Sequence, residues 1–356
     1  MKSKIESLGV YLPDTVLTTS ELMEKCSRKP RWDLEKLTGI TERRVSDNEG
    51  AVTLAVKAAS NALNMSEYEA SDIGMIIVCS ISRVYNKMDE FTMEPSLSLR
   101  VKKELGADSA LNFDVVNACA GMFTGVMILD SYIKAGVVKC GLVVSGEYIT
   151  HLADNAAKEI RHSLDGQLAS LTVGDCGAAL IMDKSNNDKT GFHFLKMVTG
   201  AKYNKLCVAH PSKRGPGAVM LTRPVRLQKA AMQNKDPYCK EAIDNTDWSL
   251  SDIDLAIPHQ TSVRAIKKGV KVMSEFQQSD MPEFEVINVE KYGNTSSTTH
   301  TLALHETILN GRLKAGNNIL FLIQASGLNL GHATYTMDDL PERYFACFGK
   351  EERKYA

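Results

Sequence analysis

Three residues with reactive or hydrogen-bonding side chains follow apolar, β-type runs at widely separated points of the chain. Cys119 follows "NFDVVNA", His259 comes directly after "LAIP", and Asn294 lies in "YGNTSS" after "FEVINV". Ligand sites of α/β sheets lie beyond the carboxyl ends of strands, so we expect the three residues to meet. A cysteine, a histidine and an asparagine form a constellation that activates a nucleophile. The sequence therefore predicts Cys119 as a thiol nucleophile with His259 and Asn294 as its partners.

Cys119 also stands where a helix is expected to begin, because "FTGVMILDSYIKAG" behind it has helical spacing. A helix N-terminus favours the thiolate, which predicts a lowered pKa for this thiol. Taken singly, each of the three residues has a plainer interpretation. A cysteine between two alanines is commonly a small core residue, and a lone His or Asn at a strand end is commonly structural. Their shared position after strands favours catalysis.

Near-continuous apolar runs alternate with helical stretches along the whole chain. The runs cover residues 72–82, 110–116, 139–147, 175–183, 252–260, 284–294 and 317–327. Helical stretches at 51–64 and 96–106 separate the first of them. This alternation predicts an α/β protein whose sheets are covered by helices. The second set of runs resembles the first, so we predict an internal duplication with halves 1–184 and 185–356. A polar linker, "KSNNDKTG", is expected to join them within 184–200.

Bulk composition narrows the function classes. The 356 residues carry a net charge of −1, which favours neither nucleic acid nor an anionic membrane as a partner. The eight cysteines form no C-x-x-C pair and show no zinc-ligand spacing, so we expect no metal and a reducing, cytoplasmic setting. The apolar stretch at the N-terminus is too short for a signal peptide. Polar residues interrupt the uncharged segment 315–337, which predicts buried strands there instead of a membrane span.

Four motifs in order resemble one known family. "DVVNACAGM", "IPHQTSVRAI", "YGNTSS" and "ASGLNLG" resemble the β-ketoacyl-acyl-carrier-protein synthase III group of the thiolase superfamily, and the resemblance covers nearly the whole chain. It implies a thiolase-like α/β fold, with two duplicated βαβαβαββ halves in five αβαβα layers, and a homodimer.

The resemblance also implies a chemistry for the three residues. Cys119 would accept an acyl group, while His259 and Asn294 would hold the enolate oxygen formed when a malonyl-type or β-ketoacyl thioester reacts. A decarboxylative Claisen condensation follows, in fatty-acid or secondary-metabolite biosynthesis. The backbone N–H groups of Cys119 and Ser326 would bind the oxyanion; Ser326 stands where the family usually has Gly. The acyl substrates are carried on phosphopantetheine, and no cofactor is expected.

An acyl carrier protein is the implied partner. Arg264 matches the family's docking arginine, and Lys267, Lys268 and Lys271 extend it into a stripe at helical spacing. A stripe of this kind is also typical of a solvated helix face. Beside a pocket entrance it favours the docking of an acidic carrier.

Two positions disfavour free coenzyme A as the acyl donor. Family members that use it carry an Arg shortly before "TGI" and another before the "GD" turn. Leu37 and Gln167 stand at those places here. The family's Trp is present as Trp32, but its spacing to Gly39 is one residue longer than in the family.

The substrate-pocket candidates are Trp32, Phe91, Met93 and Gln324. The segment around Phe91 and Met93 is longer than in the family pattern, and residues 207–232 form a long basic segment that we expect to cover the tunnel mouth. Both favour unusual or longer acyl groups, as in resorcinol- or polyene-type polyketide pathways. An ordinary priming synthase with altered loops is the alternative, because loops vary freely.

Other reaction classes share this fold. A hydroxymethylglutaryl-coenzyme A synthase needs a glutamate beside the cysteine, for which Glu90 and Glu94 are the loop candidates. An acyltransferase that delivers the acyl group to an alcohol or amine often has Asp in place of Asn294. A thiolase needs a second cysteine near the C-terminal glycine motif, from which Cys347 is distant.

Overall fold

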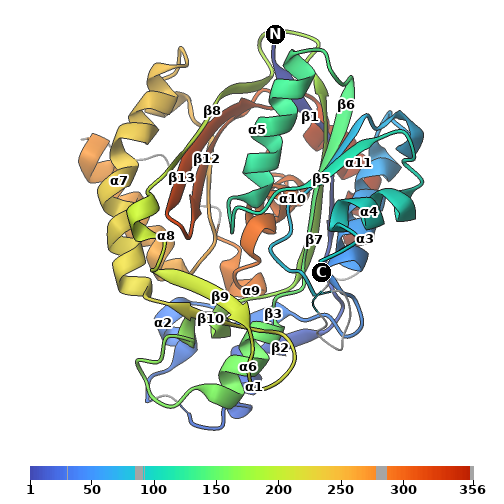
Figure 1. Ribbon diagram of the computed structural model, residues 1–356. Coiled ribbons are helices and arrows are strands. Elements are labelled where there is room, and N and C mark those ends of the chain that lie inside the picture. Colours follow the sequence, from blue (N-terminus) through green and yellow to red (C-terminus); the bar gives the residue numbers. More distant parts are fainter. Residues whose placement is uncertain (30, 85–90, 92, 278–286, 353–356) are drawn as a thin grey trace.

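The protein is organised in five layers, α-β-α-β-α, as predicted (Figure 1). The computed structural model describes residues 1–356 except 30, 85–90, 92, 278–286 and 353–356. Two sheets stand on either side of a central helical layer, and further helices cover the outer face of each sheet. Among the residues described, no helix is long and apolar enough to cross a membrane.

The N-terminal sheet has five strands in the order β1-β7-β6-β4-β5. Their bounds are β1 (Ser3–Tyr11), β7 (Cys176–Lys184), β6 (Cys140–Glu147), β4 (Met75–Val78) and β5 (Leu111–Asp114). β4 is parallel to both β5 and β6, whereas β7 is antiparallel to β6 and to β1.

The C-terminal sheet repeats this arrangement in the order β11-β12-β13-β8. Its strands are β11 (Leu255–Pro258), β12 (Asn318–Ala325), β13 (Asn329–Thr336) and β8 (Gly191–Thr199). The β11–β12 pair is parallel and the next two pairs are antiparallel, as for β4–β6, β6–β7 and β7–β1. Equal order and equal direction indicate that the two halves are copies of one topology.

Two helices lie between the sheets and both begin at the predicted site. They are α5 (Gly121–Lys134), which follows Cys119, and α10 (Thr299–Leu309), which follows Asn294 through a 3-10 turn, Ser296–Thr298. Most of α10 is buried, as expected for a helix enclosed by two sheets.

Outer helices complete the layers. α3 (Ala51–Met65) and α4 (Leu97–Leu105) cover the N-terminal sheet, and α7 (Pro224–Asp244) and α8 (Val263–Gln277) cover the other (Figure 1). The last helix, α11 (Leu340–Glu352), belongs to the C-terminal half in sequence but contacts α10, β1 and α3.

Shorter elements form a cap at one end of the layers (Figure 1). They are α1 (Thr19–Glu24), α2 (Leu34–Thr38), β2 (Val16–Thr18), β3 (Glu42–Arg44), α6 (His151–Glu159), α9 (Val289–Tyr292), β9 (Cys207–Pro211) and β10 (Ala218–Thr222). The segment 207–232 is therefore a hairpin followed by the start of α7, and not a loop.

Three sequence expectations differ from the structure. The linker between the halves is shorter than 184–200, because β7 runs to Lys184 and β8 begins at Gly191. β1 and β8 themselves were not predicted as strands. Of the expected strand at 284–294, residues 284–286 lie outside the described residues, and 289–292 form the short helix α9.

Glycines let α3 lie directly on the sheet beneath it. A side chain added at Gly9 of β1 would place its Cβ 2.1 Å from the carbonyl oxygen of Ala58 and 2.4 Å from the backbone nitrogen of Ala62. Both clashing atoms belong to helix backbone, which cannot turn aside as a flexible side chain would.

Gly9→Ala should therefore destabilise the protein by about 1–3 kcal/mol, the usual cost of forcing extra volume into a packed interior. Urea unfolding measures the effect as a lower midpoint. Gly215→Ala is the matched control, since no atom lies within 4 Å of the added Cβ. Equal midpoints for the two variants would contradict the close approach of α3.

Candidate active site

The predicted nucleophile lies in the loop that joins β5 to α5. Ala120 caps the helix and Gly121 begins it, so Cys119 sits at the helix N-terminus as expected. Ala118, directly before the thiol, has a left-handed backbone with φ 45°. This conformation costs a residue with a Cβ about 1–2 kcal/mol. The surrounding contacts must therefore hold this loop in place.

The turn from residue 294 to 299 brings the second predicted residue to the thiol. The backbone N–H of Asn294 donates to the carbonyl of Thr172 at 2.8 Å, and its own carbonyl accepts from the N–H of Gly174 at 3.2 Å. A segment of the C-terminal half is thus held by the N-terminal half. The Oδ1 of Asn294 accepts the N–H of Ser296 at 2.9 Å, which leaves its Nδ2 as the donor for a substrate.

Ser296 touches the nucleophile directly. Its hydroxyl donates to Sγ of Cys119 over 3.7 Å, within the range of hydrogen bonds to sulfur. Its backbone is left-handed, with φ 57°. Side chains of the same turn fix that conformation, because Asn294 accepts its N–H and Thr299 donates to its carbonyl at 3.0 Å.

His259 follows β11 and is buried, and its Nδ1 lies 2.9 Å from the hydroxyl of Thr299. When Thr299 donates to the Ser296 carbonyl, its oxygen accepts Nδ1–H of His259, and Nε2 is a base. When the hydroxyl rotates onto Nδ1 instead, Nε2 carries the proton and becomes a donor. The contact thus permits both roles, and the turn that reaches Cys119 also orients the imidazole.

A second histidine packs behind the first. The rings of His259 and His300 are stacked with centroids 5.9 Å apart. Burial lowers the pKa of His300 to about 4, so this ring is neutral near pH 7. Its Nε2 donates to the carbonyl of Leu322 at 3.1 Å, and the same carbonyl accepts the backbone N–H of His259 at 3.0 Å. Because His300 is neutral, it places no positive charge beside the ring of His259.

A buried carboxyl group anchors the turn from the other side. Glu147, at the end of β6, accepts the N–H groups of Ile81 and Ser82 at 3.2 Å each and the hydroxyl of Ser297. Ser145 donates to it at 3.2 Å as well. Burial raises the pKa of Glu147 to about 7.

The pKa of Cys119 differs from the sequence expectation. Burial raises it to about 12, although the hydroxyl of Ser296 acts in the opposite direction. Cys207 and Glu147 oppose ionisation of this thiol further. The prediction of a lowered pKa is therefore wrong for this structure, because removal from water outweighs the hydrogen bonds from the Ser296 hydroxyl and the backbone at Cys119. The Cys119 thiol is therefore neutral near pH 7, and the predicted nucleophilic role would require a base.

The turn between β12 and β13 approaches the Cys119 loop. It contains Ser326, whose N–H is the second predicted oxyanion donor and whose carbonyl accepts Nδ2 of Asn329 at 3.2 Å. The same Nδ2 donates to Oδ1 of Asn117 at 2.7 Å. Gly327 has φ 135°, and a Cβ there would lie 2.9 Å from the Asn329 amide, so glycine is required.

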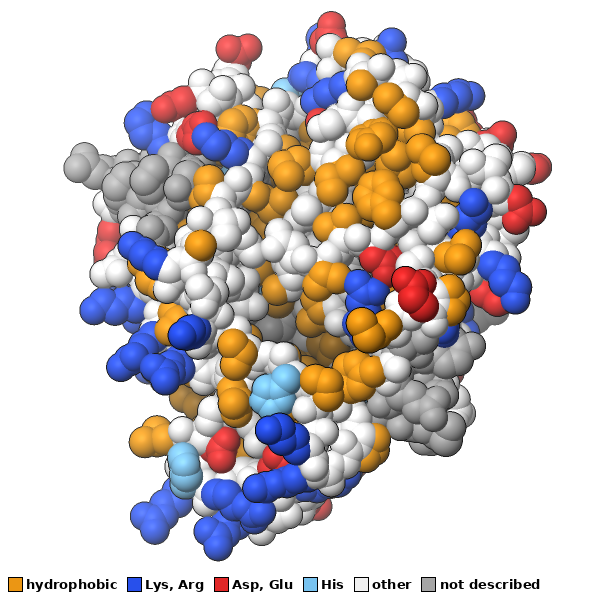
Figure 2. Space-filling view, in the orientation of Figure 1, with side chains coloured by type: hydrophobic (Ala, Val, Ile, Leu, Met, Phe, Trp, Pro, Cys, Tyr) orange, Lys and Arg blue, Asp and Glu red, His pale blue; other side chains and the backbone are white. Residues whose placement is uncertain are grey.

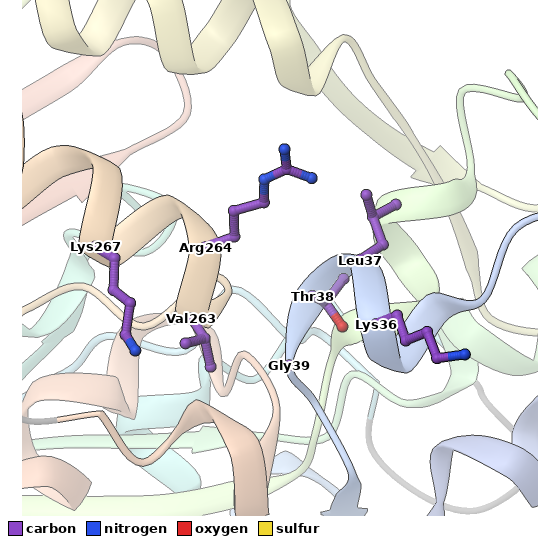
Figure 3. Close-up of a pocket in the computed structure, with 7 residues that line it drawn as sticks. All are labelled: Lys36, Leu37, Thr38, Gly39, Val263, Arg264 and Lys267. Carbon is purple, nitrogen blue, oxygen red and sulfur yellow. The ribbon is translucent and has the colours of Figure 1, made fainter.

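A surface pocket of about 380 Å³ lies between α2 and α8 (Figure 3). The side chain of Arg264 extends over it toward Leu37, and Lys36 and Lys267 stand at its margins. The predicted stripe residues Arg264, Lys267, Lys268 and Lys271 are all exposed on α8. Lys271 also lies 3.9 Å from Glu275, with both side chains largely in water.

The structure separates the substrate-pocket candidates. Trp32 is half-buried in the cap, where its indole N–H donates to the carbonyl of Ser163 at 2.9 Å. Gln324 is half-buried on β12, next to the Ser326 turn. Phe91 and Met93 are exposed on the single chain, with 43% and 89% of their surface accessible.

The residues that bear on the acyl donor and on the hydroxymethylglutaryl-coenzyme A synthase alternative differ in exposure. Leu37 is exposed beside Arg264, whereas Gln167 is buried and bonds Glu159 at 3.3 Å. Glu94 is exposed, and Glu90 lies outside the described residues.

Sequence reasoning did not find Ser296, Thr299 or Glu147. The two hydroxyl residues belong to "YGNTSSTTH", where a run of Ser and Thr directly after Asn294 was the available signal. Glu147 ends the apolar run "CGLVVSGE", and a carboxylate that ends a buried strand is a signal of the same kind.

Comparison with known proteins identifies the family of this chain. A sequence profile described as 3-oxoacyl-[acyl-carrier-protein (ACP)] synthase III matches residues 113–202, and the profile of its C terminal part matches 243–337. The chain is 30% identical to the β-ketoacyl-[acyl-carrier-protein] synthase III of Wolbachia pipientis subsp. Culex pipiens, over 93% of this chain and 98% of that protein.

Solved structures confirm the thiolase-like fold. The 3-oxoacyl-[acyl-carrier-protein] synthase III of Aquifex aeolicus is similar with a TM-score of 0.79 at 27% identity, over 94% of this chain and 100% of that chain. A variant of OleA from Xanthomonas campestris is similar with a TM-score of 0.81 at 25% identity, over 95% and 99%. This chain belongs to the 3-oxoacyl-[acyl-carrier-protein] synthase III family of condensing, acyl-transferring enzymes.

Proposed function

We propose that this protein catalyses a decarboxylative Claisen condensation between an acyl group on Cys119 and a malonyl-type or β-ketoacyl thioester on an acyl carrier protein. The observation that carries the proposal is the turn 294–299. It supplies the carboxamide of Asn294, touches the thiol through Ser296 and orients the imidazole of His259 through Thr299. Thiol, imidazole and carboxamide therefore belong to one connected site.

The first half-reaction moves an acyl group onto the thiol. Nε2 of His259 takes the proton of Cys119, the sulfur attacks the thioester carbonyl, and the leaving carrier thiol takes the proton from His259. A base is needed because burial holds the pKa of Cys119 at about 12. The Ser296 hydroxyl stabilises the thiolate while it exists, since it already donates to the sulfur.

The second half-reaction forms the carbon–carbon bond. Carbon dioxide leaves the malonyl group, and the electron pair passes into an enolate whose oxygen accepts from Nε2–H of His259 and Nδ2–H of Asn294. The enolate carbon attacks the acyl carbonyl, and the Cys119 thiolate leaves and is reprotonated. Backbone N–H groups of Cys119 and Ser326 hold the oxyanion of that step. The product is a β-ketoacyl thioester, and no step requires a metal or cofactor.

Charge on the outside of the protein supports a carrier-protein partner. The exposed cations of α8 border a surface pocket. At the site itself, the side chains that contact Cys119 and His259 include the uncharged hydroxyls of Ser296 and Thr299. Basic side chains also gather over the cap, on the side of the β9–β10 hairpin (Figure 2). An acidic carrier would be attracted to this face and could present its thioester to the site. Leu37, in place of an Arg at this pocket, supports a carrier-bound donor over free coenzyme A.

A second copy of the chain is the proposed cover for the edge of the N-terminal sheet. β5 is the last strand of that sheet, and Leu111 and Val116 at its two ends are more than half exposed. Exposed Tyr132 and Val137 continue the surface, and Figure 2 shows hydrophobic side chains gathered there beside α5. Among the described residues no further strand pairs with β5, and an edge strand with exposed apolar side chains invites pairing, so a homodimer would stabilise it.

The alternative reactions have less support. A hydroxymethylglutaryl-coenzyme A synthase needs a glutamate at the thiol, but of the two candidates Glu94 is exposed on the single chain and Glu90 lies outside the described residues. The carboxyl group of Glu147 is occupied by two backbone N–H groups and the hydroxyls of Ser145 and Ser297. An acyltransferase to an alcohol or amine forms no enolate and often has Asp at this position, so Asn294 favours condensation. Whether the pathway makes fatty acids, resorcinols or polyenes depends on the acyl chain.

Cys119→Ala should abolish covalent acylation, because the proposed chemistry places the acyl group on this thiol, which the hydroxyl of Ser296 contacts. Intact mass spectrometry after exposure to a panel of acyl-carrier and acyl-coenzyme A thioesters measures it and reports chain length and donor class at once. Cys347→Ala, at an exposed thiol of α11, is the matched control and should acylate normally. Acylation that persists in Cys119→Ala would defeat the assignment of the nucleophile.

Asn294→Ala and His259→Ala should separate the half-reactions. The amide Nδ2 of Asn294 is assigned to the enolate, so its loss should slow malonyl decarboxylation by roughly 10²–10³-fold. Self-acylation should slow much less, because it loses only the support that Oδ1 gives to Ser296. His259 serves both steps, so its loss should slow both. Carbon dioxide release and acyl-enzyme mass measure the two rates. If Asn294→Ala lost self-acylation to the same degree as decarboxylation, the role given to its amide would be wrong.

Reversal of two stripe charges, Arg264→Glu with Lys268→Glu, should weaken carrier-dependent turnover at low salt through repulsion. Single exposed charge pairs contribute only about 0.2–1 kcal/mol, so Arg264→Ala alone should cost less than about tenfold. The KM for the carrier at several salt concentrations measures this, and the effect should fade near 1 M salt, where the Debye length is about 3 Å.

Lys184→Glu with Lys189→Glu makes the same charge change on a distant exposed segment and is the control. Acylation from a small thioester without a carrier should be the same in all these variants. Unchanged carrier kinetics in the α8 double variant would reduce the stripe to a solvated helix face.

A further inference from the structure

Two asparagines join the Cys119 loop to the Ser326 turn across the two halves of the chain. Nδ2 of Asn329 donates to Oδ1 of Asn117 at 2.7 Å, between residues 212 positions apart. Asn117 lies two residues before the nucleophile, and Asn329 begins β13 directly after the turn that holds Ser326. Each amide belongs to one of the two loops that carry a proposed oxyanion donor.

Both amides have a single consistent orientation. Nδ2 of Asn329 also donates to the carbonyl of Ser326 at 3.2 Å, and a carbonyl can only accept. Its Oδ1 accordingly accepts the hydroxyl of Thr199 at 2.6 Å. Reversal of the Asn329 amide would place an oxygen against the Ser326 carbonyl and lose both donations.

The chain of hydrogen bonds continues into α5. Nδ2 of Asn117 donates to the hydroxyl of Thr124 at 2.9 Å, and that hydroxyl donates to the carbonyl of Ala120 at 2.9 Å. The series therefore runs from β8 through Asn329 and Asn117 to the first turn of the helix that follows Cys119. Every donor in it meets an acceptor.

Oxyanion donors act only when their spacing is right. Two N–H groups must lie about 2.7–3.1 Å from one developing oxyanion, and a misplacement of about 1 Å can cost 10²-fold in rate. Cys119 and Ser326 come from different halves, and the loop of Cys119 includes the left-handed Ala118. A direct bond between the loops would hold that spacing.

We propose that Asn117 and Asn329 are positioning residues, whose amide–amide hydrogen bond sets the distance between the backbone N–H groups of Cys119 and Ser326. The inference rests on the condensation proposed above. It goes beyond it, because neither side chain contacts a reacting atom and both act through the backbone of their loops.

The test is a double-mutant cycle of Asn117→Ala, Asn329→Ala and the combined variant. Each single substitution breaks the same bond, so each should lower the kcat of condensation by about 10–100-fold with the KM for the carrier little changed. The combined variant should lose no more than the worse single variant. Self-acylation of Cys119 from a small thioester should slow in parallel. Malonyl decarboxylation without an acyl donor, which uses His259 and Asn294, should stay within about twofold.

Asn61→Ala is the matched control, since it removes a half-buried amide that donates to the carbonyl of Val10 at 2.8 Å on the far side of the N-terminal sheet. Urea unfolding of all variants separates a loss of stability from a loss of rate. Asn117 is the more exposed of the pair, so Asn117→Ala decides the question alone if Asn329→Ala does not fold.

Three results would overturn the inference. They are a kcat within twofold of wild type in Asn117→Ala, losses that multiply in the combined variant, or decarboxylation that falls as far as acylation. Failure of the proposed function looks different, because wild type itself would then form no β-ketoacyl product. The rate of Cys119 acylation would still report on the pair in that case.

Discussion

The contact between the hydroxyl of Ser296 and the sulfur of Cys119 depends on a turn that one half of the chain supplies and the other half holds. The backbone of Asn294 is bonded to Thr172 and Gly174, and the hydroxyl of Ser297 is bonded to Glu147. Each of these partners belongs to the N-terminal sheet or the segments beside it. The site therefore exists only where the two copies of the topology meet, and neither copy could form it alone.

Burial of this junction explains the chemistry that the residues share. Removal from water raises the pKa of Cys119 and of Glu147 and lowers that of His300, so the groups around the thiol favour their neutral forms. Hydroxyls and amides supply the hydrogen bonds instead of charges. The acyl-enzyme and the enolate of the proposed reaction are both sensitive to water, and a largely neutral, buried site would protect them from hydrolysis and from protonation. The same burial means that the Cys119 thiol would ionise only with the help of a base, which is His259 in the proposed reaction.

The basic residues of α8 lie on the surface of the protein and not in the buried site. Cations of α8 stand at the pocket beside α2, where a large polar partner can be attracted without a charge in the interior. The apolar surface around β5 is a separate feature, at the edge of the N-terminal sheet. The proposed carrier-protein surface, the proposed dimer surface and the proposed active site therefore lie on three different parts of the fold. This separation explains why a net charge of −1 for the whole chain says little about any one of them.

Local patterns in the sequence determined the order of strands and helices, the duplication, and the position of Cys119 at the start of a helix. These depend on spacing along the chain and on apolar content, which a sequence displays directly. The sequence did not predict β1 as a strand, because Lys4 and Glu6 interrupt its apolar pattern. Only the fold supplies the hydrogen-bond partners of these two residues, Asp338 and Ser66. The contacts of Ser296 with Cys119 and of Asn117 with Asn329 join residues 177 and 212 positions apart. The raised pKa of Cys119 likewise follows from burial by distant segments. Only the tertiary structure decided these features, because desolvation and cross-half hydrogen bonds depend on which segments come together in space.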